Sequence, residues 1–216
     1  MNFAEYLQAN WKTVLDALWD HIELSFLSSL AAVILAVPIG ILLTRNEKVS
    51  KIVLAAAGII QTIPGLVMLG IGLLLFGLGS RSAIIVLVAY AMLPIMQNTY
   101  TGIKEIDGLY IEAAKGIGMS QRQVLSKVEI PLALPAIIAG IRLSVVYIIS
   151  WATLAALIGA GGLGDLIWTG LSSYDSNMIL AGAIPASVLA VAAGLLIDLL
   201  HRAVTPRSMR VKGGRE

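Results

Sequence analysis

The chain has 216 residues, of which 58% are hydrophobic and only 13% are charged, with a formal net charge of +2 and a mean hydropathy of +0.89. A soluble domain of average composition carries about 25% charged residues, so this balance excludes an ordinary water-soluble globular protein. Cysteine is absent, which excludes disulfides, thiolate chemistry and cysteine-ligated metal sites.

Five segments of the chain are apolar enough to cross a bilayer. Residues 52–80 contain no charged side chain, and three later uncharged stretches are each 22 residues long. A helix needs about 20 apolar residues to cross a hydrocarbon core of about 30 Å. Since the five segments use most of the length, we predict one transmembrane domain over residues 1–216 and an all-α membrane protein. The expected spans are residues 24–44, 52–78, 82–103, 132–158 and 177–199.

The first span follows an acidic N-terminal segment. A cleaved signal peptide starts with a basic region and has a shorter apolar core, whereas here Glu5, Asp16 and Asp20 precede the apolar run and Lys12 is the one cation. We therefore interpret residues 24–44 as a retained span. The first twenty residues carry aromatic rings among polar side chains, which is typical of a segment at the headgroup level.

The second span contains a proline-glycine pair. Residues 52–78 are too long for one straight crossing, and the sequence QTIPGL occupies positions 61–66. Such a pair predicts a kink or a break in the helix. Both residues are frequent in membrane helices, which favours a packing role for the kink over a gating hinge, but the sequence leaves both roles open.

The fourth span carries a cation near its start. The uncharged run begins only at Leu143, so we expect the helix to start in the cytoplasm and to enter the bilayer near Arg142. The long side chain of Arg142 then reaches the interface. A position at the bilayer centre would instead mark Arg142 as a functional residue.

A glycine-rich segment, IGAGGLGD, follows the fourth span at residues 158–165. It lacks the GxxxxGK[ST] pattern of a phosphate-binding loop. We predict that these glycines allow close backbone packing at a helix turn on the outer face.

Lysine and arginine are distributed unequally between the loops. Twelve lie on one predicted side of the membrane, two lie on the other side (Lys12 and Arg81), and Arg142 lies inside or beside the fourth span. Because Lys and Arg concentrate in cytoplasmic loops, we predict an external N-terminus and a cytoplasmic C-terminus. The twelve are Arg45, Lys48, Lys51, Lys104, Lys115, Arg122, Lys127, Arg202, Arg207, Arg210, Lys212 and Arg215.

The longest polar interruption, residues 104–131, is expected to be cytoplasmic and helical. Residues 109–115 predict a short helix that the following glycines end. Ser120 lies three positions before Gln123, a capping-box spacing that starts a second helix, which is expected to run until Pro131 ends or bends it. Such a helix-turn-helix segment either caps the bundle or presents itself to a soluble partner, and its pattern leaves both alternatives open.

Within this interruption the sequence EAAKGIGMSQRQVLSKVEIP, residues 112–131, resembles the EAA loop of permease subunits of ABC importers. The usual pattern is E-A-A, three residues, G, nine residues and then I-x-L-P. The chain departs from it by two aliphatic exchanges near the end, which preserve volume and hydrophobicity. The resemblance assigns ATPase coupling to Glu112, Ala113, Ala114, Gly118 and Pro131.

The resemblance implies the type I ABC importer (MetI-like) permease fold, with a helix that docks on a nucleotide-binding ATPase subunit. ATP is then hydrolysed on that partner, so the chain itself is expected not to be an enzyme and to hold no catalytic residue, metal or cofactor. A second permease subunit, identical or homologous, is also implied. The implied location is the plasma or inner membrane of a bacterium. Membrane lipid is an expected partner, and nucleic acid is not.

A narrower resemblance covers nearly the whole chain. The segments VPIGILLTR, QTIPGL, LPIMQNTYTGI, AGIRLS, WATLAALIGAGGLGD and AGAIPA are similar to those of osmoprotectant importer permeases. Such permeases serve glycine betaine, carnitine, choline or related quaternary amines. In that family an extracytoplasmic binding protein makes the main choice of substrate. The resemblance implies that this binder is a separate polypeptide.

Aromatic side chains inside the spans are candidates for the substrate path. A quaternary ammonium has no N–H donors, so aromatic faces are the groups that attract it. Tyr90, Tyr147 and Trp151 lie within spans, and the last two are four apart and share a helix face. The favoured alternative to a role in the substrate path is that these rings pack between helices or lie at the membrane–water interface. Gln61 and Asn98 are buried polar candidates that interhelical hydrogen bonding explains equally well.

Three alternatives to an osmoprotectant permease remain open. An ABC importer for another small solute, such as an amino acid, would share the coupling loop. An autonomous secondary transporter or channel tends to place ionisable groups within its spans, and these spans are almost free of them. A membrane enzyme would have to use His21 and His201, which are expected near opposite membrane faces, without an HExxH pattern.

Overall fold

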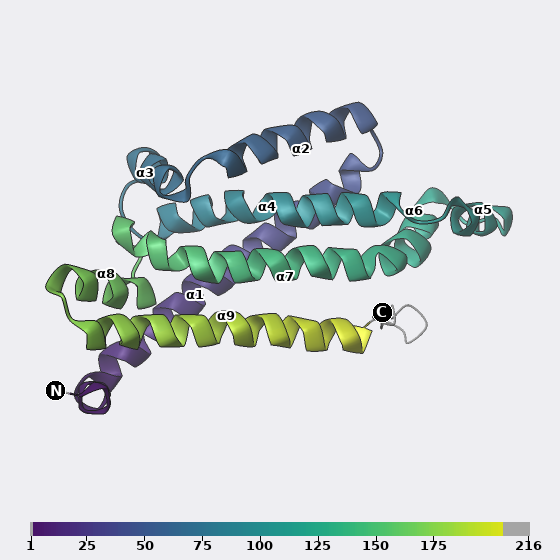
Figure 1. The fold of residues 1–216 in the computed structure, drawn as a ribbon. Helices are drawn as coiled ribbons and strands as arrows, with labels where there is room; N and C mark the ends of the chain where they lie inside the picture. The colour runs from purple at the N-terminus through teal and green to yellow at the C-terminus, as the bar shows by residue number, and fades with distance from the viewer. Residues whose placement is uncertain (1, 205–216) are drawn as a thin grey trace, which may run out of the picture.

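The computed structural model describes residues 2–204, and all regular structure in this part of the chain is helical (Figure 1). The predicted basic tail residues Arg207, Arg210, Lys212 and Arg215 lie outside the described residues. The elements are α1 (Phe3–Leu43), α2 (Glu47–Thr62), α3 (Gly65–Phe76), α4 (Ser80–Lys104), α5 (Gly108–Gly116), α6 (Gln121–Val124), the π-helical turn η1 (Leu125–Glu129), α7 (Ile130–Ala155), the 3₁₀ turn η2 (Ala156–Ile158), α8 (Leu163–Ser173) and α9 (Ser176–Val204).

The long helices form a layer that α1 crosses. α2, α4, α7 and α9 lie side by side, and α1 runs diagonally across them (Figure 1). α4 packs mainly on α7 and α1, and α9 packs on α8 and α7. Ala32 and Ala36 of α1 are fully buried, as is Ala152 of α7. Small residues let backbones approach closely, which is how helices associate in lipid, where apolar burial gives little driving force.

The predicted number of about five spans is confirmed. Four helices are long and apolar enough to cross a membrane, and the bent pair α2 and α3 makes a fifth if it is counted as one span. The start of α1 and the end of α9 lie at opposite ends of the bundle (Figure 1).

α1 begins about twenty residues before the predicted first span. Its start is fixed by a capping box, in which Asn2 Oδ1 accepts from the Glu5 backbone N–H at 2.8 Å and Glu5 Oε2 accepts from the Asn2 N–H at 3.0 Å. The predicted headgroup-level segment is therefore part of the same helix, with one non-helical residue at Asn10. Trp11 and Trp19 are 53% and 68% exposed on it.

The predicted break in the second span is confirmed. α2 ends at Thr62, α3 begins at Gly65, and their axes meet at 99°. Pro64 is the N-cap residue of α3, where its missing N–H costs no helical hydrogen bond. The bend is thus much larger than a proline kink within a continuous helix.

Pro131 was predicted to end or bend the second loop helix, and of these alternatives the end is wrong. Residues 121–158 form one continuous helical run. Pro131 occupies the first turn of α7, directly after the π-helical turn η1. A π-helical turn shifts the hydrogen-bond pattern by one residue, which lets the chain pass a proline without ending the helix.

Arg142 forms an ion pair with an acidic residue of another helix, which the sequence did not predict. Its Nε lies 2.8 Å from Asp198 Oδ1, which joins the middle of α7 to the last third of α9. The two side chains are 48% and 38% exposed. Pairing lowers the cost of holding either charge within a long apolar helix.

Candidate functional site

α5, α6 and the turn between them, residues 108–124, form a knob at one end of the bundle (Figure 1). α5 ends in a Schellman motif, because the Gly118 N–H donates to Lys115 O at 2.9 Å and the Met119 N–H donates to Ala114 O at 3.1 Å. Gly118 has φ +84°, the left-handed conformation that this motif requires. The glycine of the EAA pattern therefore sets the geometry of the turn.

The predicted capping box starts α6. The Ser120 N–H donates to Gln123 Oε1 at 2.8 Å, and the Gln123 N–H donates to Ser120 Oγ at 3.4 Å. Ala114 and Val124 are 5% and 3% exposed, so these two apolar residues attach the knob to its surroundings. The knob is consequently an ordered helix-turn-helix unit.

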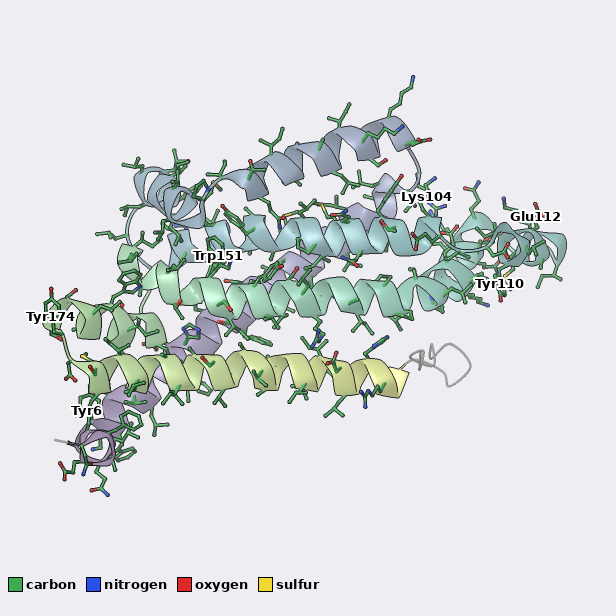
Figure 2. All side chains as sticks on the ribbon, in the orientation of Figure 1. Tyr6, Lys104, Tyr110, Glu112, Trp151 and Tyr174 are labelled. Carbon is green, nitrogen blue, oxygen red and sulfur yellow. The ribbon has the colours of Figure 1, made fainter. Side chains whose placement is uncertain are left out.

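Other residues of the knob face outward. Glu112, Ala113 and Gly118 are exposed, and Figure 2 shows Glu112 and Tyr110 at the tip of the knob. Leu109, Tyr110 and Ile117 are 69%, 59% and 76% exposed. Large apolar side chains held outward on a short helix are typical of a protein-docking surface. Of the five coupling residues named from the sequence, three are thus exposed on the knob and Ala114 is buried. The fifth, Pro131, is exposed but lies beyond the knob, at the start of α7.

An ion pair missed by sequence reasoning lies beside the knob. Arg45, just beyond α1, places Nη2 2.6 Å from Oε2 of Glu129, the last residue of η1. The pair borders a pocket of about 420 Å³ that Lys115 and Gln121 of the knob also line. The only signal in the sequence was a charged residue at each edge of an apolar run, and nothing there indicates that the two meet.

The three aromatic candidates for the substrate path come together. Tyr90 of α4 stacks on Trp151 of α7, with ring centroids 5.1 Å apart and planes inclined at 24°. Tyr147 lines the same pocket and is 45% exposed. Figure 2 shows Trp151 near the junction of α3, α4 and α7.

The two polar candidates differ in their surroundings. Gln61 lines the aromatic pocket, and its Nε2 donates to the backbone oxygen of Tyr90 at 3.0 Å. Asn98 instead donates from Nδ2 to Pro94 O, one turn earlier in its own helix, at 2.8 Å. Its side chain packs closely against α7, because a Cβ on Gly140 would lie 2.7 Å from Asn98 Cβ. Gln61 is therefore part of the aromatic pocket, whereas Asn98 lies in the packed contact between α4 and α7.

The glycine segment after α7 packs closely, as predicted. Gly159, Gly161 and Gly162 all have positive φ, and a Cβ at Gly162 would lie 3.1 Å from His21 Nδ1. His21 is fully buried, and its Nε2 donates to Ile149 O at 3.0 Å. The segment between the predicted spans 132–158 and 177–199 also contains α8.

Acidic side chains gather at this end of the bundle. Asp20 and Glu23 of α1 line a pocket of about 270 Å³ with Ser80 of α4. Loss of water around its carboxyl, and secondarily the negative charge of Asp20, raise the pKa of Asp165 at the start of α8. Among residues 2–204, no three His, Asp or Glu side chains lie close enough together to hold a metal ion.

Comparisons with known proteins agree on one family. Residues 36–210 match the family described as binding-protein-dependent transport system inner membrane component. A carnitine transport permease protein (OpuCB) of Listeria monocytogenes is 42% identical over 205 residues, covering 95% of this chain and 94% of the relative. A choline transport system permease protein (OpuBB) of Bacillus subtilis is 41% identical, covering 97% and 96%.

A more distant relative supports the same assignment, and a solved structure shares the fold. An osmoprotectant import permease protein (OsmW) of Salmonella typhimurium is 37% identical, covering 97% of this chain and all of the relative. The fold is similar to that of a chain in an inward-facing structure of the MetNI methionine ABC transporter, with a TM-score of 0.80 at 23% identity, covering 89% of this chain and 96% of the other. The chain belongs to the family of inner membrane components of binding-protein-dependent transport systems.

Proposed function

We propose that the chain is a permease subunit of an ATP-driven importer of quaternary ammonium osmoprotectants. The observation that carries this proposal is the identity of 41% to 42%, over nearly the full length, to permeases named for carnitine, choline and glycine betaine transport. The similar solved structures from methionine and amino acid transporters are at most 24% identical to this chain. They therefore support the fold and not the choice of substrate.

The proposed partners are nucleotide-binding ATPase subunits, a second permease subunit and an extracytoplasmic binding protein. ATP is hydrolysed on the ATPase, and the permease converts the closure of that subunit into a change of access along the path. A ligand or partner shifts the equilibrium between the inward-facing and outward-facing states only by the difference in its affinity for them. The knob, residues 108–124, is suited to transmit this shift because its capping box and Schellman motif make it rigid.

The knob is proposed to enter the ATPase through its outward residues. Leu109, Tyr110 and Ile117 supply apolar surface, and Glu112 supplies a charge beside them. Ala114 and Pro131 act differently in this proposal, because Ala114 is a buried residue of the knob and Pro131 follows η1 in the first turn of α7. This use of the knob requires a cytoplasmic location, in line with the excess of Lys and Arg in the loops at that end.

Uptake into proteoliposomes tests the proposal. The permease is reconstituted with the ATPase and the binding protein, and uptake of labelled glycine betaine, carnitine and choline is measured with each component and ATP left out in turn. Uptake that requires all of them is expected. Uptake by the permease alone would indicate an autonomous carrier or channel, and uptake of methionine or histidine in place of the amines would indicate an amino acid importer.

A further inference from the structure

The break between α2 and α3 is held by side chains of two neighbouring helices. The Tyr90 hydroxyl of α4 donates to the backbone oxygen of Ile63, the residue at the break. Gln61, at the end of α2, donates back to the Tyr90 backbone oxygen at 3.0 Å. A backbone carbonyl freed by a helix break inside a membrane needs a protein or water donor, and the phenol supplies it.

Trp151 of α7 also packs against the break. A Cβ on Gly65 would overlap the six-membered ring of Trp151, so the ring lies directly against the backbone at the first residue of α3. The same ring of Trp151 stacks on the ring of Tyr90, with centroids 5.1 Å apart. Only glycine at position 65 leaves room for this arrangement.

The pocket that these rings form is nearly filled. It has a volume of about 20 Å³, room for a single water molecule. Gln61, Tyr90, Tyr147 and Trp151 line it with aliphatic neighbours, and none of the lining residues is charged. Separating Trp151 from Tyr90 would enlarge the pocket and expose two aromatic faces beside the ring of Tyr147.

We infer that the pocket of Gln61, Tyr90, Tyr147 and Trp151 binds the quaternary ammonium group of the substrate during passage, and that the stack of Tyr90 on Trp151 closes it in this structure. The inference rests on the proposed function. A permanent cation without N–H donors is attracted by ring faces and donates no hydrogen bond to an acceptor. The lack of a lining carboxylate keeps the binding weak, which suits a site that the substrate must leave.

The ring of Tyr147 offers the cleanest test of the site. It is 45% exposed, and its hydroxyl has no hydrogen-bond partner among residues 2–204, so replacing it disturbs the fold least. The complete complex of permease, ATPase and binding protein is assayed for amine imported per ATP hydrolysed. Tyr147→Leu is expected to lower this ratio about 2- to 30-fold, which is the factor for the loss of one cation–π contact. Tyr147→Phe retains the aromatic ring, so its ratio is expected to equal that of the wild type. Trp19→Leu, at a tryptophan 68% exposed on α1, is the matched control.

The closing contact has its own test. Tyr90→Phe keeps the stacked ring but removes the hydrogen bond to Ile63, and it is expected to raise ATP hydrolysis in the absence of loaded binding protein. An unchanged rate would overturn the role of that bond in closure. Equal import ratios for Tyr147→Leu, Tyr147→Phe and the wild type would overturn the binding site. A wild-type complex that imports no quaternary amine would instead overturn the proposed function itself.

Discussion

Arg45 Nη2 lies 2.6 Å from Glu129 Oε2, which ties the end of α1 to the π-helical turn between the knob and α7. The two side chains are unequally buried, with Arg45 50% exposed and Glu129 only 7% exposed. The carboxylate therefore depends on the pair more than the guanidinium does, because a buried charge that loses its partner keeps its desolvation cost.

Replacing Arg45 with Gln is expected to destabilise the protein by about 1.5 to 3 kcal/mol, the range for a hydrogen bond to a charged group. Thermal unfolding of the purified permease in detergent measures the change. Lys51→Gln is the matched control, because it breaks the exposed pair with Glu47, whose N–O distance is 2.9 Å. Equal losses in the two variants would argue against a special role for Glu129 burial. Adding Glu129→Gln to Arg45→Gln is expected to restore part of the stability.

Gly118 is expected to be sensitive because of its backbone conformation rather than its surroundings. Its φ is +84°, and nothing lies within 4 Å of the position of a Cβ. A bulky residue such as Leu costs about 1 to 2 kcal/mol in this conformation and distorts the turn. We expect Gly118→Leu to insert into the membrane normally but to lose the ATPase during affinity purification.

Two variants isolate the cause of that loss. Gly118→Asn is expected to retain more ATPase than Gly118→Leu, because Asn tolerates the left-handed region. Gly116→Leu adds the same bulk two residues earlier, at a helical glycine that also has open space around it. If Gly116→Leu and Gly118→Leu lose the ATPase equally, steric bulk on the knob is the cause and the backbone argument fails.

Tyr110 is expected to contribute strongly to ATPase binding. It is 59% exposed at the tip of the knob, and aromatic residues dominate the energetics of protein interfaces (Figure 2). Tyr110→Ala is expected to weaken binding of the isolated ATPase by about 2 kcal/mol or more, measured by titration on the reconstituted permease. Tyr174→Ala changes a tyrosine that is 94% exposed at the opposite end of the bundle, so unchanged affinity is expected there. Equal effects at both sites would contradict docking through the knob.

Among the three glycines with positive φ between α7 and α8, Gly162 is expected to be the least replaceable. It has φ +83°, and a Cβ would lie 3.1 Å from His21 Nδ1 and 3.2 Å from His21 Cα. Gly162→Ala therefore combines backbone strain with a steric contact against a fully buried residue, at a cost of about 1 to 3 kcal/mol. At Gly159, where φ is +75°, the nearest atoms are 3.8 Å away, so Gly159→Ala carries the strain alone. Thermal unfolding of both variants should rank Gly162→Ala as the less stable.

The free energy of unfolding is expected to depend on pH through the titration of Asp165. Because desolvation and Asp20 raise its pKa in the folded protein, the folded state holds this proton more tightly than the unfolded state does. The stability that this group contributes is complete below the pKa of the unfolded chain and is lost as pH rises through the raised folded value. Asp165→Asn should therefore be more stable than the wild type at neutral pH, and the difference should shrink as the solution is acidified. A constant difference across that range would contradict the raised pKa.

Local chemistry determined a large part of this protein. Only helices satisfy the backbone in a lipid environment, so the long apolar runs predicted the span helices. The break at Pro64, the Ser120 capping box and the turn at Gly118 followed from residues only a few positions apart. Pro131 is the exception, because the π-helical turn before it carries the helix onward.

The contacts across the layer were decided by the tertiary structure alone. The pairing of Arg45 with Glu129 and the stacking of Tyr90 on Trp151 join residues that are far apart in the chain. Periodicity fixes which face of a helix is apolar, but the rotation of α4 and α7 and the crossing of α1 depend on where small residues let the backbones meet. The sequence therefore supplied the candidate groups, and packing selected which of them share a site.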